Sequence, residues 1–196
     1  NPEHIVFCPR VVQAVSLYIQ NFTQPGDAIV SLAPAYHPIS HAVEVNHRVL
    51  LESALLYRDR SYEIDFADLE DKFKTACCFI LISPHNPTGT IWSEDNLRKI
   101  ASLAEKYNVF IISDDVHADF NFIKKQHQTI SSISSYVAQN SFICTSPAKT
   151  FNMAGLEIAN IVIANDKCRE KFKSALIAAG IHNPGYFSVP AFLCAY

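Results

Sequence analysis

A chain of 196 residues, with 49% hydrophobic and 18% charged side chains, is long enough to bury the core of one domain. Its formal net charge of −3 gives no electrostatic reason to expect nucleic acid or an anionic membrane surface as a partner. No apolar run approaches the roughly 20 residues that a membrane-spanning helix needs, so we expect neither partner.

The cysteines and the two ends of the chain suggest where the protein resides and how complete the sequence is. The six cysteines form no CxxC pair and have no spacing typical of disulfides, so we expect free thiols in a reducing cytoplasm. The first residue is Asn1, the only methionine is Met153, and Tyr196 falls within an amphipathic helical pattern. We therefore expect this chain to be an internal piece of a longer protein.

Nearly continuous apolar runs alternate with amphipathic helical patterns along the chain. The expected strands cover 27–34, 47–53, 77–83, 109–115, 141–147 and 158–165. The expected helices cover 10–21, 38–46, 66–74, 93–108, 129–138 and 166–179. Strands that are apolar throughout are typical of a sheet covered on both faces. The sequence therefore predicts one α/β domain of three layers (α/β/α) with a mostly parallel sheet. The stretch 123–128 is expected to be a solvated loop.

Polar residues follow four of the expected strands, where ligands bind in open α/β sheets. These strand ends read APAYHP, SPHNPTG, SDDVH and TSPAK. Lys149 could simply extend into solvent, or it could be a desolvated amine that condenses with a carbonyl group. Asp114 could cap a helix or bind a metal, or it could hold a proton on a heterocyclic nitrogen. A pyridoxal phosphate ring needs both a lysine and an acid of this kind.

Three further residues at these strand ends have an ordinary and a functional interpretation. Asn86 lies in a turn that Pro87 and Gly89 would form, and its amide could donate to the phenolic oxygen of such a ring. His117 could be a surface histidine or a second partner of that oxygen. Tyr36 could be a half-buried aromatic residue or could stack on a flat ring.

The strings HNPTG, SDDVH and SPAKTFNMAGL, in this order, resemble the fold-type I pyridoxal-phosphate enzymes, the aspartate aminotransferase superfamily. They look most like its carbon–sulfur β-lyase branch, the cystathionine β-lyases of the MalY/PatB type, which the segment PAYHPISHAVEVNHRVL also resembles. The likeness covers essentially the whole chain but only the central, large-domain part of the family's length. It implies the large, cofactor-binding domain of such an enzyme over residues 1–196, without the N-terminal segment and the C-terminal small domain.

The resemblance implies a site for pyridoxal 5'-phosphate. Lys149 would hold the cofactor as a Schiff base and later move protons at the substrate Cα, and Asp114 would keep the ring nitrogen protonated. The other matching positions are Asn86 and His117 at the phenolic oxygen, Tyr36 stacked on the ring, Ser146 at the phosphate, and the backbone amides near Arg10 and Val11 at a helix N-terminus, also at the phosphate.

The sequence departs from the family pattern near the expected phosphate. Many relatives carry an arginine eight residues after the lysine, where this chain has Glu157, although the β-lyase branch often lacks that arginine. Ala148 replaces a common hydroxyl residue, and CPRVV has no glycine in the phosphate loop. We expect Glu157 to point away or to be screened, and phosphate binding to be weaker than usual.

The predicted function is a pyridoxal-phosphate-dependent carbon–sulfur β-lyase that cleaves cystathionine or cysteine to a thiol, pyruvate and ammonia. A class I/II aminotransferase is the alternative, because the first steps at Lys149 are shared. A non-catalytic, doubly wound binding domain is a distant alternative, and none of the five glycines forms a phosphate-binding motif. The implied partners are an amino-acid substrate and a second copy in the full-length protein, so the fragment itself is expected to be inactive. His37 and His41 are interpreted as surface residues rather than metal ligands.

Overall fold

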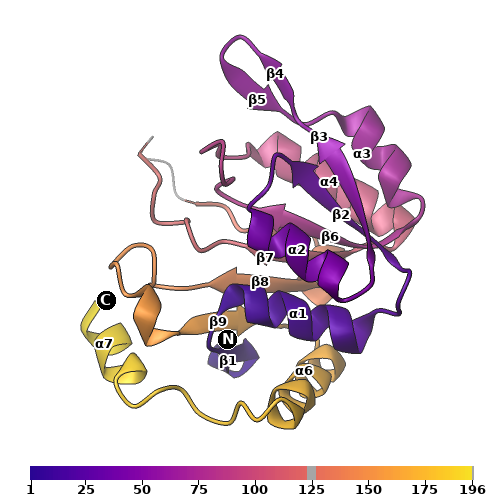
Figure 1. The fold of residues 1–196 in the computed structure, drawn as a ribbon. Coiled ribbons are helices and arrows are strands. Elements are labelled where there is room, and N and C mark those ends of the chain that lie inside the picture. Colours follow the sequence, from indigo (N-terminus) through magenta and orange to yellow (C-terminus); the bar gives the residue numbers. More distant parts are fainter. Residues whose placement is uncertain (123–126, 196) are drawn as a thin grey trace.

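The computed structural model describes residues 1–122 and 127–195, so most of the loop expected at 123–128 lies outside the described residues. A seven-stranded sheet has the order β1-β9-β8-β7-β6-β2-β3 (Figure 1). Its strands are β1 (Ile5–Cys8), β2 (Ala28–Ala33), β3 (Val49–Ala54), β6 (Ala76–Ile82), β7 (Phe110–Asp114), β8 (Ser141–Thr145) and β9 (Ala159–Val162). The strands from β8 to β3 are parallel, whereas β9 is antiparallel to both of its neighbours.

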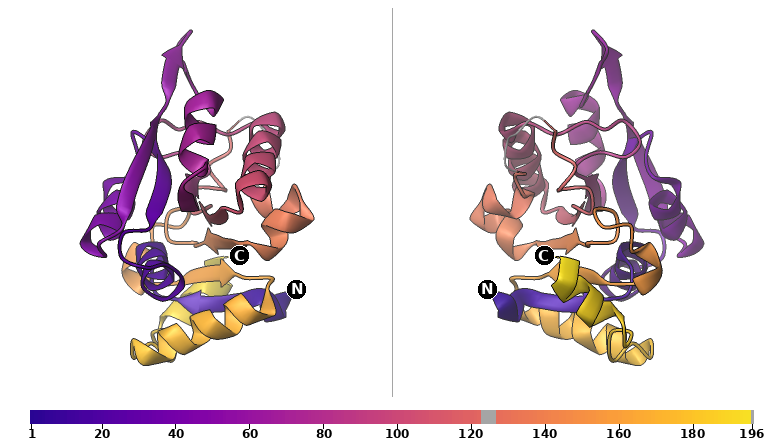
Figure 2. Two further views of the ribbon diagram at one scale, coloured as in Figure 1. Left: turned by 90° about the vertical axis from the view of Figure 1, so that its right-hand side faces the viewer. Right: turned by 90° about the vertical axis from the view of Figure 1, so that its left-hand side faces the viewer.

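Helices cover both faces of this sheet (Figure 2). The first face packs against α1 (Val11–Phe22), α2 (His37–Val45) and α6 (Asp166–Ala178), and the second against α3 (Phe66–Phe73), α4 (Glu94–Tyr107) and α5 (Ser135–Gln139). Each face has its own buried core. Phe142 is at the centre of the first, with its ring in contact with the rings of Tyr18 and Phe172. The predicted three-layer α/β/α fold is confirmed.

The helix expected at 93–108 illustrates how the local sequence sets an element. Ser93 accepts a hydrogen bond from the N–H of Asn96, whose side chain in turn accepts from the N–H of Ser93 and completes a capping box. Leu97 and Ile100 are buried on one face of α4. The helix ends at Asn108, whose left-handed conformation (φ 56°) is typical of a C-terminal cap.

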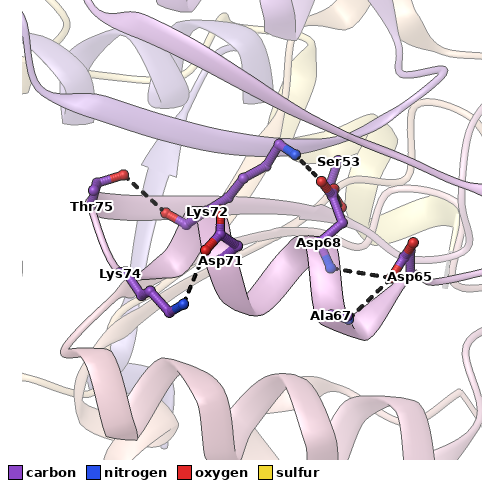
Figure 3. Close-up of polar contacts among 8 residues, drawn as sticks. All are labelled: Ser53, Asp65, Ala67, Asp68, Asp71, Lys72, Lys74 and Thr75. Atoms are coloured by element: carbon purple, nitrogen blue, oxygen red, sulfur yellow. Dashed lines mark hydrogen bonds and ion pairs between the residues drawn. The ribbon is translucent and has the colours of Figure 1, made fainter.

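Helix α3 is capped and is also joined to the edge strand of the sheet (Figure 3). The Asp65 carboxylate accepts hydrogen bonds of 3.1 Å from the N–H groups of Ala67 and Asp68. Asp68 forms an ion pair with Lys72 one turn later, and it accepts a 2.7 Å bond from the hydroxyl of Ser53 on β3. These contacts fix the first turn of the helix against the sheet.

Several elements differ from the sequence prediction. Strand β1 and the hairpin of β4 (Leu56–Arg58) and β5 (Ser61–Glu63) were not predicted, because each strand is only three or four residues long. The helix predicted at 129–138 is wrong as a single element. It divides into a 3-10 turn, η2 (Ile130–Ser132), and α5, because Ser134 caps the second piece by accepting from the N–H of Val137.

The remaining elements are short. They are the 3-10 turns η1 (Pro2–His4) and η3 (Ala154–Leu156) and the last described helix, α7 (Ser188–Ala195). Among the described helices, none combines the length and the apolar character needed to cross a bilayer. Strands β2, β6, β7 and β8 are parallel neighbours, so the four polar strand ends found in the sequence meet at one edge of the sheet.

Candidate active site

A cleft of about 450 Å³ lies at the carboxyl ends of these parallel strands. Its walls come from the start of α1, the residue before α2, the end of β7 and the segment that follows β8. The predicted site residues that line it are Arg10, Val11, Tyr36, Asp114, Ser146 and Lys149. The structure therefore brings together six of the eight predicted residues, from segments that are far apart in the sequence.

Lys149 lies in a tight turn directly after β8. The N–H of Phe151 donates to the carbonyl of Pro147, and the N–H of Met153 donates to that of Ala148, both at 3.0 Å. The lysine side chain is exposed. The turn presents Lys149 at the mouth of the cleft, and the alternative of a desolvated amine stays a prediction for the complete protein.

Asp114, the last residue of β7, is buried in the same cleft at 5% exposure. Burial raises the pKa of its carboxyl to about 7, although a 3.3 Å hydrogen bond from the N–H of Val116 and the charge of Lys149 both act to lower it. A carboxyl group with a pKa near 7 can either hold or release a proton at neutral pH. Asp114 is also close enough to Lys149 for the charge of the amine to affect its pKa.

The second acid of the SDDVH string, Asp115, has a separate structural role. Its carboxylate is 2% exposed and accepts hydrogen bonds from Ser113 at 2.5 Å and Thr129 at 3.3 Å, and it pairs with His127 at 2.8 Å. The SDDVH string alone does not distinguish the two adjacent acids. Asp114 ends β7 and lines the cleft, whereas Asp115 follows the strand and lies in this polar network.

Asn86 and His117 line a second cavity, of about 490 Å³, rather than the main cleft. His117 is half-buried, and burial followed by the charge of Lys149 lowers the pKa of its imidazole. The predicted turn around Asn86 is confirmed, since Gly89 has φ 71° and its N–H donates to the carbonyl of His85 at 2.7 Å. Whether either side chain contacts a ring oxygen stays a prediction.

His85 was not singled out from the sequence. It is 2% exposed, its Nδ1 lies 2.9 Å from the Thr88 hydroxyl, and its ring lies against Trp92. Burial lowers the pKa of its imidazole to about 4, so the ring is neutral at ordinary pH. This histidine supports the turn that presents Asn86.

Tyr36 and Ser146 occupy the expected positions in the cleft. Tyr36 is 38% exposed immediately before α2, so one side of its ring is available for stacking. The hydroxyl of Ser146 donates to the carbonyl of Ile158 at 2.6 Å and accepts from the N–H of Ala148 at 3.1 Å. Its single donor is therefore engaged by the chain itself.

Arg10 is the N-cap residue of α1, where no side chain caps the helix, and it forms an ion pair with Glu157. The pair screens the Glu157 carboxylate, as expected from the sequence. Because the first N–H groups of a helix have no intrahelical partner and carry partial positive charge, the start of α1 suits an anion. From the sequence, only the backbone amides near Arg10 and Val11 were predicted to bind the phosphate, and the guanidinium of Arg10 was not.

The segment that carries Lys149 is also tied to the segment after β7. The hydroxyl of Thr150 donates to the carboxylate of Asp119 at 2.7 Å. Neither residue was predicted to take part in the site, and only the position of Thr150 beside Lys149 could have suggested it. The bond connects the two loops that supply the lysine and Asp114.

Taken together, the donor groups of the cleft fit the pyridoxal phosphate expected from the sequence. The cleft offers an amine, a buried acid near neutrality, an aromatic ring and a helix N-terminus beside a guanidinium. His37 and His41 do share one face of α2, with ring centroids 5.6 Å apart. No group of three or more potential metal ligands lies together in the part of the chain that the structure describes.

The sequence model of the family described as aminotransferase class I and II matches residues 1–196. The chain belongs to this family. It is 41% identical over 198 residues to cystathionine β-lyase PatB of Bacillus subtilis, a match that covers 100% of the chain and 51% of the relative. It is 34% identical over 167 residues to a cystathionine β-lyase of Corynebacterium glutamicum, covering 85% of the chain and 44% of the relative.

Solved structures agree with this membership. Cystalysin of Treponema denticola, whose crystal structure contains pyridoxal 5'-phosphate, superimposes with a TM-score of 0.94 at 33% identity over 97% of this chain and 49% of its own. The chain spans about half the length of the curated relatives it matches. The shared fold is thus a mostly parallel sheet between two layers of helices.

Proposed function

We propose that the complete protein is a pyridoxal-phosphate-dependent carbon–sulfur β-lyase that acts on a sulfur amino acid such as cystathionine or cysteine. The observation that carries the proposal is that Lys149 and the buried Asp114 line one cleft and interact electrostatically. The similarity to two cystathionine β-lyases favours this reaction within the family. Family membership argues against the non-catalytic binding domain.

Each residue of the cleft would then have a defined task. When bound, the cofactor supplies an electron sink that stabilises a carbanion at the substrate Cα. Lys149 would hold the cofactor and would remove the proton from the substrate Cα. Asp114 holds a proton at the ring nitrogen. The elimination breaks the bond between Cβ and sulfur, releases a thiol and, after water is added, yields pyruvate and ammonia.

The other predicted residues would position the cofactor. Tyr36 stacks on the ring, and Asn86 and His117 approach its phenolic oxygen from the neighbouring cavity. The start of α1 would hold the phosphate, through the N–H groups near Val11, the Arg10 guanidinium and the Ser146 hydroxyl, all of which line the cleft. To bind it, Ser146 has to give up its hydrogen bond to the carbonyl of Ile158.

The proposal extends to the setting of this chain. Residues 1–196 form the large, cofactor-binding domain, with a small domain supplied by further sequence and a second copy completing the site in a homodimer. The coverage of about half of each relative supports a larger protein. All six cysteines are free thiols, which suits a reducing compartment such as the cytoplasm.

An aminotransferase is the second candidate, because the description of the family names that reaction. The two reactions differ in where the proton goes after Lys149 has removed it from Cα. A β-lyase releases pyruvate from cystathionine without any keto acid, whereas an aminotransferase needs a keto-acid acceptor and forms no thiol. Measuring pyruvate and free thiol with and without added keto acid separates the two.

The assignment of the cofactor rests on Lys149 and is tested by covalent mapping. The complete protein is incubated with pyridoxal phosphate, reduced with borohydride and digested, and the modified peptide is identified by mass. We expect the adduct on Lys149, its loss in Lys149→Ala and its retention in Lys167→Ala, which alters an exposed lysine on α6. An unmodified Lys149 in the complete protein would contradict the proposal.

A further inference from the structure

Arg10 and Glu157 form an ion pair at the rim of the cleft, although they are 147 residues apart in the sequence. Both residues line the same cleft as Lys149 and Asp114. Their side chains are 65% and 44% exposed, and ion pairs exposed to this degree add little to the stability of a fold. Stability alone therefore does not account for the pair.

The backbone at Glu157 provides a second observation. Glu157 follows η3 in the left-handed region, with φ 49° and ψ 64°, where glycine or asparagine is favoured and a longer side chain is uncommon. Residues held in unfavourable backbone regions cluster at functional sites. The chain thus keeps a carboxylate in an unfavourable conformation directly beside the guanidinium of the cleft.

This end of the cleft has few other groups for an anion. The hydroxyl of Ser146 is engaged by the carbonyl of Ile158, and no side chain caps α1. Lys149 and Tyr36 also line the cleft, but the proposed function assigns them to the cofactor ring and its aldehyde. The donors left for an anion at the start of α1 are then the first N–H groups of the helix and the guanidinium of Arg10. An anion at the α1 terminus and the carboxylate of Glu157 therefore require the same side chain.

We propose that Glu157 is an internal counter-ion that competes with the cofactor phosphate for Arg10. In the cofactor-free protein the guanidinium of Arg10 pairs with the carboxylate of Glu157. When the cofactor binds, Arg10 pairs with the phosphate instead, because the planar set of N–H donors of a guanidinium matches a phosphate as well as a carboxylate. The identity of the anion rests on the proposed function. The exchange weakens cofactor binding, because each binding event has to break the ion pair.

The test measures the dissociation constant of pyridoxal phosphate for the complete protein and its Glu157→Gln, Arg10→Gln and double variants by calorimetric titration. We expect Glu157→Gln to bind about two- to fivefold more tightly, since an exposed ion pair no longer has to be broken. Arg10→Gln should bind about tenfold more weakly, since a charge-assisted hydrogen bond is lost. In the Arg10→Gln background, the further change Glu157→Gln should bring no gain.

Two controls make the result specific. Glu94→Gln breaks a similarly exposed ion pair with Arg98 on α4, away from the cleft, and should leave the dissociation constant unchanged. Pyridoxal, which lacks the phosphate, should bind all variants equally. The midpoints of thermal unfolding of the cofactor-free variants should agree, because an exposed ion pair adds little to stability.

Three results would overturn the proposal: an unchanged dissociation constant in Glu157→Gln, weaker binding in that variant, or the same gain with and without Arg10. The third would mean that Glu157 simply repels the phosphate. Inorganic phosphate serves as an independent probe, because it stabilises the folded protein in proportion to its affinity. Inorganic phosphate tests the competition for Arg10 even if Lys149 proves to carry no pyridoxal phosphate. Failure of the proposed function can therefore be told apart from failure of this inference.

Discussion

Burial raises the pKa of the Asp114 carboxyl to about 7, and the charge of Lys149, which lines the same cleft, opposes that rise. Asp114 ends β7 and pairs in register with Cys144 on the neighbouring parallel strand β8, and Lys149 follows Cys144 by five residues in the turn after β8. Strand pairing and the hydrogen bonds of that turn thereby hold a carboxyl group and an amine at the same end of the sheet. Because the pKa of Asp114 is near 7, its ionisation can be followed by varying the pH around neutrality.

The stability of the cofactor-free protein should depend on the ionisation of Asp114. Its folded-state pKa of about 7 lies above its ordinary value of 3.8, so the folded state binds this proton more tightly than the unfolded state. The stabilisation is fully present below about pH 4 and is lost as the pH rises to about 7. We expect the free energy of unfolding to fall by about 4 kcal/mol more over this range in the native protein than in Asp114→Asn.

Urea unfolding of the cofactor-free protein at a series of pH values measures this difference. Asp71→Asn, which alters an exposed carboxylate on α3, is the matched control and should follow the native pH profile. Parallel profiles for the native protein and Asp114→Asn would show that the buried carboxyl does not take up its proton near neutrality.

Removing the partner of a buried carboxylate should destabilise the fold. His127→Ala leaves Asp115, which is 2% exposed, with only the hydroxyls of Ser113 and Thr129. A buried acceptor that loses a partner costs about 1–3 kcal/mol. We expect chemical denaturation to show this loss in the free energy of unfolding of His127→Ala. The control His41→Ala, which alters an exposed histidine on α2, should show no measurable change. Equal stability of the two variants would rule out a stabilising role for the Asp115 network.

Two isoleucines on helices allow a test of the core on the second face of the sheet. Ile100 on α4 is fully buried, whereas Ile177 on α6 is 60% exposed. Ile100→Ala should cost about 2–5 kcal/mol through lost burial and the cavity left behind. Ile177→Ala changes helix propensity in the same way and should stay within about 0.5 kcal/mol of the native protein. Similar losses at both positions would contradict the packing of α4 against the sheet.

The cap of α3 should account for a definite part of its stability. Asp65→Ala removes the acceptor of two backbone N–H groups at the start of the helix, and a lost N-cap typically costs about 1 kcal/mol. Asp71→Ala removes an acid from the exposed side of the same helix, where it pairs only with Lys74, and should cost little. Thermal unfolding of both variants measures the difference, and a larger loss in Asp71→Ala would show that the exposed pair matters more than the cap.

The sequence predicted the centre of the sheet well because β2, β6, β7 and β8 are mostly buried and read as continuous apolar runs. The helix at 93–108 was equally clear, since its cap and its apolar face coincide. Short and exposed elements gave no such pattern, so β1 and the β4–β5 hairpin were missed. Periodicity also could not show that Ser134 caps a new helix inside the segment 129–138.

The candidate site was predictable in its residues but not in its arrangement. Lys149 and Asp114 were identified from their positions after strands, and the structure brings them into one cleft. The sequence could not decide between an exposed and a desolvated Lys149, because it does not reveal which segments cover a strand end. The pairing of Arg10 with Glu157 joins residues 147 positions apart, and only the strand order makes them neighbours.

Among the described strands, β1 pairs only with β9, which places Cys8 opposite Ala159. On a ribosome the first strand therefore leaves the exit tunnel long before its partner has been made. At about 5–20 residues per second, the intervening chain takes roughly 8–30 s to synthesise. The parallel strands β2, β6 and β7 can pair with one another during that interval. Strand β1, which directly precedes α1, thus gains its pairing in the sheet only after β9 has been made.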